Sequence, residues 1–193
     1  KVLHSRCVEI AKKYGVELLV CSSLNRNSGT MVREKTKMEK MLISGVAADK
    51  NVAKIRVAGL GNDPESTFRL LNLLDRNNLN IDVMIQSLGK DGTKSVSFTV
   101  AKPDMLRTID VLNDNKDSLG IKKLDYDENV AKISVIGAGV RSHSGVAAKM
   151  FGALANAGIN TEMITTSEIR ITALIDEAYA DQAMRAIHET FLE

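Results

Sequence analysis

Residues 52–61 read VAKIRVAGLG and residues 130–139 read VAKISVIGAG, so seven of ten positions are identical at an offset of 78. Further on, LNIDVMIQS (79–87) matches INTEMITTS (159–167) at an offset of 80, which requires two additional residues in the intervening loop of the second copy. Loops are the parts of a fold that tolerate such insertions. The repeat therefore indicates a supersecondary unit that is duplicated within one chain.

The first copy switches between the two periodicities of regular structure. Residues 54–57 alternate between charged and apolar side chains, which is typical of a strand with one buried face. A helix is predicted from Pro64, with an apolar face formed by Phe68, Leu70, Leu71 and Leu74. A strand from Asn80, a turn at 90–92, a strand at 96–100, a helix from Pro103 with the stripe Leu106, Ile109 and Leu112, and a strand at 121–126 complete the copy. The order β-α-β-β-α-β is the ferredoxin-like arrangement.

The second copy follows the same order but ends one strand short. Strands are predicted at 130–136, 161–166 and 168–175, and helices from Gly145, with Val146, Met150, Phe151 and Leu154 inward, and at 178–191. Because folds avoid an unpaired sheet edge, we expect the segment MLISGVA (41–47) to complete this sheet. The first copy would then be inserted into the second, in an α+β fold. The expected domains are 48–126, then 38–47 with 127–193, while 1–37 would be the edge of another domain.

The composition narrows the class of protein. Hydrophobic residues make up 44% and charged residues 26%, which is typical of a globular chain that buries a core. Lys and Arg number 26 against 24 Asp and Glu, and aromatic residues are few, so nucleic acid is a poor candidate partner. Two cysteines, Cys7 and Cys21, are too few for a disulfide framework and fit a reducing cytoplasm. No apolar run approaches the length of a membrane span. The chain begins without Met, which suggests a piece of something longer.

The Gly-x-Gly turns between strand and helix suggest an anion site. The third glycine of a dinucleotide fingerprint is absent, since Pro64 and Ser142 stand there, so nicotinamide binding is not expected. The exposed N–H groups of a helix N-terminus would suit a carboxylate. Opposite it, the strand residues Asn80, Asp82 and Gln86, and Asn160, Glu162 and Thr166, could complete a zwitterion site, with the ammonium on Asp82 or Glu162. Alternatively, Asn80 and Asn160 only cap turns with their own side chains.

No catalytic or metal site is predicted. The run Ser142, His143, Ser144 carries atoms that suit nucleophilic catalysis, but adjacent loop residues rarely adopt the needed geometry and no orienting acid is identified. The three histidines, His4, His143 and His188, are dispersed along the chain. We therefore expect neither a catalytic residue nor a metal ligand.

Residues 134–171, SVIGAGVRSHSGVAAKMFGALANAGINTEMITTSEIRI, closely resemble the C-terminal regulatory region of bacterial aspartokinases, in which two ACT domains follow a kinase domain. Residues 2–32 resemble the end of that kinase domain. The resemblance implies one ACT unit inserted in the other, homodimers through ACT domains, and lysine, threonine or both bound between ACT units of paired chains to inhibit phosphorylation of aspartate by ATP. The ATP and Mg²⁺ sites would lie in a kinase domain outside this sequence, so no cofactor and no activity are expected of this chain alone.

The resemblance also implies a set of effector-binding residues. In the first copy these are Asn62, Asp63, Glu65, Thr67, Asn80, Ile81, Asp82 and Gln86. In the second they are Ser142, His143, Gly145, Val146, Ala147, Asn160, Thr161, Glu162, Thr166, Ser167 and Glu168. The family's first loop reads Asp-x-Pro-Gly-x-Ala, whereas here Asn62 replaces the Asp and Glu65 the Gly, and this departure favours lysine over threonine. Two other classes stay open: a stand-alone amino-acid-binding or dimerisation module, and a small-molecule enzyme on the same scaffold.

Overall fold

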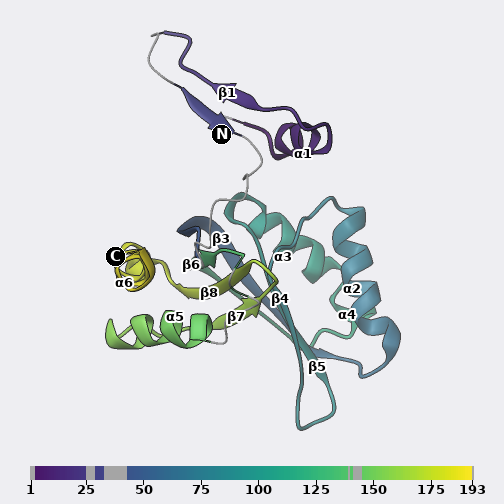
Figure 1. Ribbon diagram of the computed structural model, residues 1–193. Helices are drawn as coiled ribbons and strands as arrows, with labels where there is room; N and C mark the ends of the chain where they lie inside the picture. The colour runs from purple at the N-terminus through teal and green to yellow at the C-terminus, as the bar shows by residue number, and fades with distance from the viewer. Residues whose placement is uncertain (1–2, 25–28, 33–42, 139, 141–144, 193) are drawn as a thin grey trace. The chain divides into compact units, whose positions relative to one another are not determined.

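The computed structural model describes residues 3–24, 29–32, 43–138, 140 and 145–192, which fall into two compact parts, residues 1–40 and residues 41–193. In the N-terminal part, helix α1 (Ser5–Lys13) precedes strand β1 (Leu18–Val20), which pairs antiparallel with β2 (Thr30–Val32) (Figure 1). Sequence patterns predict a helix at 5–14 and a strand at 18–20, and both are confirmed. The turn that Asn27, Ser28 and Gly29 predict lies largely outside the described residues.

The larger part is built on one antiparallel sheet of six strands in the order β4-β5-β3-β6-β8-β7 (Figure 1). The strands are β3 (Gly45–Leu60), β4 (Met84–Leu88), β5 (Lys94–Ala101), β6 (Lys123–Ile136), β7 (Met163–Thr166) and β8 (Arg170–Asp176). The helices are α2 (Pro64–Arg76), α3 (Met105–Asp114), α4 (Lys116–Leu119), α5 (Gly145–Asn156) and α6 (Ala180–Leu192), with short 3-10 turns at Lys102–Asp104 and Glu177–Tyr179. No helix among the described residues is long and apolar enough to cross a membrane.

The strand pairing confirms that the first copy is inserted into the second. Residues 45–49 of β3 pair with residues 132–136 of β6, which supplies the strand that the second copy lacks. Further along, residues 54–58 of β3 pair with residues 123–127 of β6 and complete the first copy. The strand predicted at 41–47 and the one predicted around 54–57 are therefore parts of one strand of 16 residues, which begins at Gly45; residues 41 and 42 lie outside the described part. Each copy has the strand order 2-3-1-4 of a ferredoxin-like unit.

A local twofold axis relates the two copies. Val52 pairs directly with Val130, the equivalent residue of the other copy. The residue pairs on one side of this contact correspond to those on the other side, with the two copies exchanged. Each strand has a register shift here, and on each a carboxylate accepts a hydrogen bond from the backbone two residues on: Asn51 N–H donates to Asp49 at 3.0 Å and Asn129 N–H to Asp127 at 2.9 Å. The repeat thus begins before Val52 and Val130, at Asp49 and Asp127.

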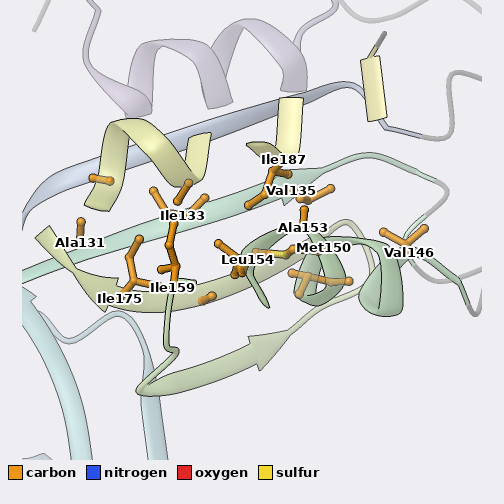
Figure 2. Packing of buried hydrophobic residues seen from close by; sticks show 14 of the residues in the cluster. Ala131, Ile133, Val135, Val146, Met150, Ala153, Leu154, Ile159, Ile175 and Ile187 are labelled. Atoms are coloured by element: carbon orange, nitrogen blue, oxygen red, sulfur yellow. The ribbon is translucent and has the colours of Figure 1, made fainter. Parts of the chain in front are cut away.

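Each copy packs its own helices on its own part of the sheet. In the second copy, Val146, Met150 and Leu154 of α5 pack with Ile133 and Val135 of β6, as Figure 2 shows, so the predicted inward face of α5 is confirmed. In the first copy, a separate cluster joins Leu70 and Leu74 of α2 to β3 and β5. Val52 and Val130 belong to a third cluster with Val83, Met163 and Leu174.

Two predicted helix faces need correction. Phe68 is 65% exposed and Leu106 is 68% exposed, although both were expected to face inward. The buried face of α2 is Ser66, Leu70 and Leu74, spaced four residues apart, and Phe68 lies about 200° around the helix from Ser66. On α3 the buried residues are Met105, Thr108 and Leu112, and the Thr108 hydroxyl donates to the Asp104 carbonyl oxygen. Small polar residues that hydrogen-bond to residues nearby in sequence are thus buried, where the hydrophobicity pattern predicts larger apolar side chains.

Candidate functional site

The N-terminus of α2, where an anion was expected to bind, is capped by the protein itself. The Asp63 carboxylate accepts hydrogen bonds from the N–H groups of Glu65 at 3.0 Å and Ser66 at 2.9 Å, and from the Ser66 hydroxyl. These bonds, the one from the Ser66 side chain foremost, hold the pKa of Asp63 below its usual value. Asp63 therefore acts as the N-cap of α2, and two of the amide groups offered by this helix end already have an acceptor.

The Asp63 cap predicts a pH dependence of stability. A carboxyl group whose folded pKa is lowered stabilises the fold above its unfolded pKa, and this contribution is lost as the pH falls through the folded value. We expect Asp63→Ala to lower the melting temperature at about pH 7 and the difference from the wild type to shrink towards about pH 2. Thermal unfolding followed by circular dichroism measures this, with Asp114→Ala, at the end of α3, as the matched control. A difference that does not vary with pH would contradict the charged cap.

Two of the predicted effector residues meet beside this cap. The Thr67 hydroxyl of α2 donates to the Gln86 side-chain oxygen of β4 at 2.6 Å. The Lys94 ammonium of β5 donates to the Asp63 carbonyl oxygen at 2.7 Å. Strands β4 and β5 thus hold the first turn of α2, and Asn62 and Glu65 lie exposed in the same region.

Asp82 lies in a different setting, at the junction of the two copies. Its carboxylate accepts from the Lys132 ammonium at 2.5 Å and lies 3.8 Å from the Arg170 guanidinium. Lys132 also pairs with Asp49 at 3.1 Å. Burial acts to lower the pKa of Lys132, but the hydrogen bonds to Asp82 and Asp49 outweigh it, so that this pKa lies above its usual value. Lys132 is therefore a charged ammonium at every physiological pH.

A cleft of about 310 Å³ opens beside this ion pair. Its lining comes from both copies and includes Asp49, Asn51, Asn80, Ile81, Asp82, Asp104 and Lys132. Within the described residues, the lining contains none of the 62–67 loop. The sequence reasoning placed Asp82 and the α2 N-terminus around one site, whereas in this chain they belong to separate surroundings.

The second copy repeats the ion pair. Glu162, the equivalent of Asp82, accepts a hydrogen bond from the ammonium of Lys54, which is the equivalent of Lys132. Each pair therefore joins a carboxylate of one copy to a lysine of the other. Sequence reasoning missed both lysines as functional candidates. The available signal was their identity in the repeated VAKI segment, where a charged residue recurs within an otherwise apolar run.

The other predicted residues of the second copy are spread over α5 and the β7–β8 hairpin. Ser142 and His143 lie outside the described residues. Gly145 begins α5, Val146 is buried in the core and Ala147 packs against it, so the Val146 side chain is not available to a ligand. Asn160 and Thr161 precede β7, Thr166 ends it, and the Ser167 N–H donates to the Arg170 carbonyl oxygen in the turn, where Glu168 is exposed.

The fold and the comparison with family models define the class of protein. A model of the ACT domain matches residues 133–191, the greater part of the second copy. Together with the twofold relation between the copies, this match defines a tandem ACT-domain protein.

Solved structures identify the family more closely. The ligand-free regulatory subunit of aspartate kinase from Thermus thermophilus is 33% identical, with a TM-score of 0.73 over 78% of this chain and 99% of that chain. A crystal structure of aspartokinase alpha and beta subunits is 42% identical, with a TM-score of 0.73 over 77% and 98%. The chain belongs to the aspartokinase family and corresponds to its regulatory ACT region.

Longer relatives extend over almost the whole chain. The aspartokinase of Pseudomonas aeruginosa is 38% identical over 99% of this chain and 47% of its own length. The chain thus spans about half the length of the curated relatives it matches. Escherichia coli aspartokinase III, in complex with lysine and aspartate, shares the fold with a TM-score of 0.78 at 23% identity, over 100% of this chain and 43% of that chain.

Proposed function

We propose that this chain is the allosteric region of a cytoplasmic aspartokinase, which binds lysine, threonine or both and thereby inhibits ATP-dependent phosphorylation of aspartate. Its partners would be a catalytic kinase domain or subunit and a second copy of the regulatory region. Residues 1–37 would be the end of the kinase domain. Residues 48–126 and residues 38–47 with 127–193 would be the two ACT domains.

The observation that carries this proposal is the duplicated strand start, Asn80 to Asp82 and Asn160 to Glu162, on a chain that belongs to the aspartokinase family. An amide followed by a carboxylate offers a donor, an acceptor and a negative charge at one place, which suits the ammonium group of an amino acid. The cleft that contains Asn80 and Asp82 has room for such a ligand. Ile81 contributes an apolar wall to the same cleft.

Lysine is the effector we favour. The first loop lies outside the lining of the 310 Å³ cleft, but it departs from the family pattern at Asn62 and Glu65, so a close backbone approach to threonine at this loop is disfavoured. Asp49 and Asp104 add negative charge to the lining of the 310 Å³ cleft, where a second ammonium group would be attracted. The lysine complex of the fold relative from Escherichia coli is compatible with this choice.

The effector acts by shifting a conformational equilibrium. Only a difference in its affinity for two arrangements of the regulatory region can change the activity of the kinase. Lysine would therefore bind more tightly to the inhibited arrangement. In the whole enzyme, aspartate and ATP would weaken lysine binding by the same factor by which lysine weakens theirs.

Calorimetric titration of the chain with lysine, and then with threonine, tests the proposal. We expect saturable binding of lysine, and we expect Asn80→Ala to weaken it about tenfold through the loss of one or two hydrogen bonds. Asn113→Ala, on the exposed side of α3, is the matched control and should leave the affinity unchanged. If neither amino acid binds, the proposed function is wrong for this chain; if only threonine binds, the choice of lysine is wrong.

A further inference from the structure

The two lysines that hold the predicted effector carboxylates carry the same chemical group as the effector. Lys132 presents an ammonium to Asp82, and Lys54 presents one to Glu162. An amino-acid effector would present its own ammonium to the same carboxylates. Both positions are thus occupied by a group from the other copy of the repeat.

We propose that Lys132 and Lys54 are tethered competitors of the effector, which must displace an ammonium from Asp82 or Glu162 in order to bind. The inference rests on the proposed function, because it takes the effector to be an amino acid held at these strand starts. Beyond that function, Lys132 and Lys54 would set the affinity for the effector, and effector binding would break their contacts with Asp82 and Glu162.

After displacement from Asp82, the Lys132 ammonium still has a carboxylate partner in Asp49. This ammonium lies between two carboxylates, Asp82 at 2.5 Å and Asp49 at 3.1 Å, and the Lys132 side chain is only 14% exposed. When an effector ammonium takes Asp82, Lys132 keeps its charge paired with Asp49. Displacement therefore leaves no charge uncompensated in a partly buried place, which would otherwise be costly.

The tether makes this competition effective. The Lys132 ammonium is attached to β6, so its effective concentration at the Asp82 carboxylate is high, whereas a free amino acid must reach this carboxylate from dilute solution. The pairs are partly exposed, with Asp82 and Asp49 side chains 47% and 49% exposed, so each pair is weak enough to be displaced. The lysines thus raise the effector concentration that is needed for binding.

Displacement also changes the link between the two copies. Asp82 belongs to the first copy and Lys132 to the second, and Glu162 and Lys54 are related to them by the local twofold axis. An effector ammonium at Asp82 removes a direct contact between the copies. Binding at one strand start is in this way coupled to the arrangement of both ACT units.

The test compares lysine titrations of the wild-type chain, Lys132→Met and Lys123→Met. Lys123 is the matched control, because its ammonium pairs with Asp125 at 2.8 Å on the same strand, away from Asp82. We expect Lys132→Met to bind lysine about fivefold more tightly, the size expected for removing a competing, partly exposed ion pair, and Lys123→Met to bind like the wild type. Damage to the fold would weaken binding, so a gain in affinity is not produced by a merely structural role.

The other possible results of these titrations distinguish failure of the competitor role from failure of the proposed function. Unchanged or weaker binding by a folded Lys132→Met overturns the competitor role while leaving the proposed function in place. If Lys132→Met does not fold, the equivalent variant Lys54→Met decides by the same criterion at Glu162. Absence of binding in the wild type overturns the proposed function, and with it this inference.

Discussion

Replacing Phe98 with alanine is expected to lower the free energy of unfolding by about 4 kcal/mol. Phe98 is fully buried in the core of the first copy, where it pairs with Ile55 on one side and Met84 on the other. Removing the ring loses its transfer free energy and leaves a cavity in a sheet whose strands are held on both sides, so the site has little freedom to collapse. Urea unfolding followed by circular dichroism measures the change.

Phe68→Ala is the matched control for this experiment. The same side chain is removed, but Phe68 is 65% exposed on α2, so the expected change is within about 0.5 kcal/mol. Equal losses for the two variants would mean that Phe68 is buried in solution, and the assignment of the inner face of α2 would then be wrong. A small loss for both would contradict the packing described around Phe98.

The two phenylalanines also show where sequence reasoning succeeds and where it stops. The alternation of Val96, Phe98 and Val100 in the strand predicted at 96–100 places these three side chains on one face, because successive residues of a strand point to opposite faces. On α2 the apolar residues are too numerous for one face, and Ser66, a polar residue that bonds to Asp63, occupies a buried place. Hydrophobicity alone cannot identify such a residue, since its burial depends on a partner three residues away.

The insertion of one copy in the other was predictable, but the continuity of the strands was not. Counting strands identified the missing edge and the segment before residue 48 that fills it. The residues that join the two halves of β3, Asp49 to Asn51, are polar and exposed, and in sequence they indicate a turn. In the structure they form a bulge that keeps the strand going past the local twofold axis.

The sequence repeat predicted that Asp82 and Glu162 are equivalent, but not the arrangement of the side chains around them. The repeat singled out Asp82 and Glu162 correctly as equivalent residues, yet their partners come from the other copy, 50 and 108 residues away in sequence. Strand periodicity places Lys54 and Lys132 on the polar side of their strands and says nothing of which carboxylate they reach. That depends on how the two copies meet, which follows from the register of β3 and β6.

Replacing Gly59, the first glycine of the Gly-x-Gly turn in the first copy, is expected to have the second large effect on stability. Gly59 has a φ of 88°, at a register shift between β3 and β5, and a Cβ added there would lie 2.5 Å from the Cβ of Lys122. Alanine would therefore meet both a backbone conformation that L-residues disfavour and a close approach between β3 and the segment that leads into β6. We expect Gly59→Ala to lower the free energy of unfolding by about 3 kcal/mol.

Gly120→Ala separates these two causes. Gly120 has a similar left-handed conformation, with a φ of 69°, but nothing lies within 4 Å of an added Cβ. Its substitution should therefore cost only the conformational strain, about 1 kcal/mol. The difference between the two variants in urea unfolding then measures the close approach to Lys122. If the two losses are equal, this approach is relieved without cost, and the Gly-x-Gly turn of the first copy is required by its backbone conformation alone rather than by the packing of β3 against the start of β6.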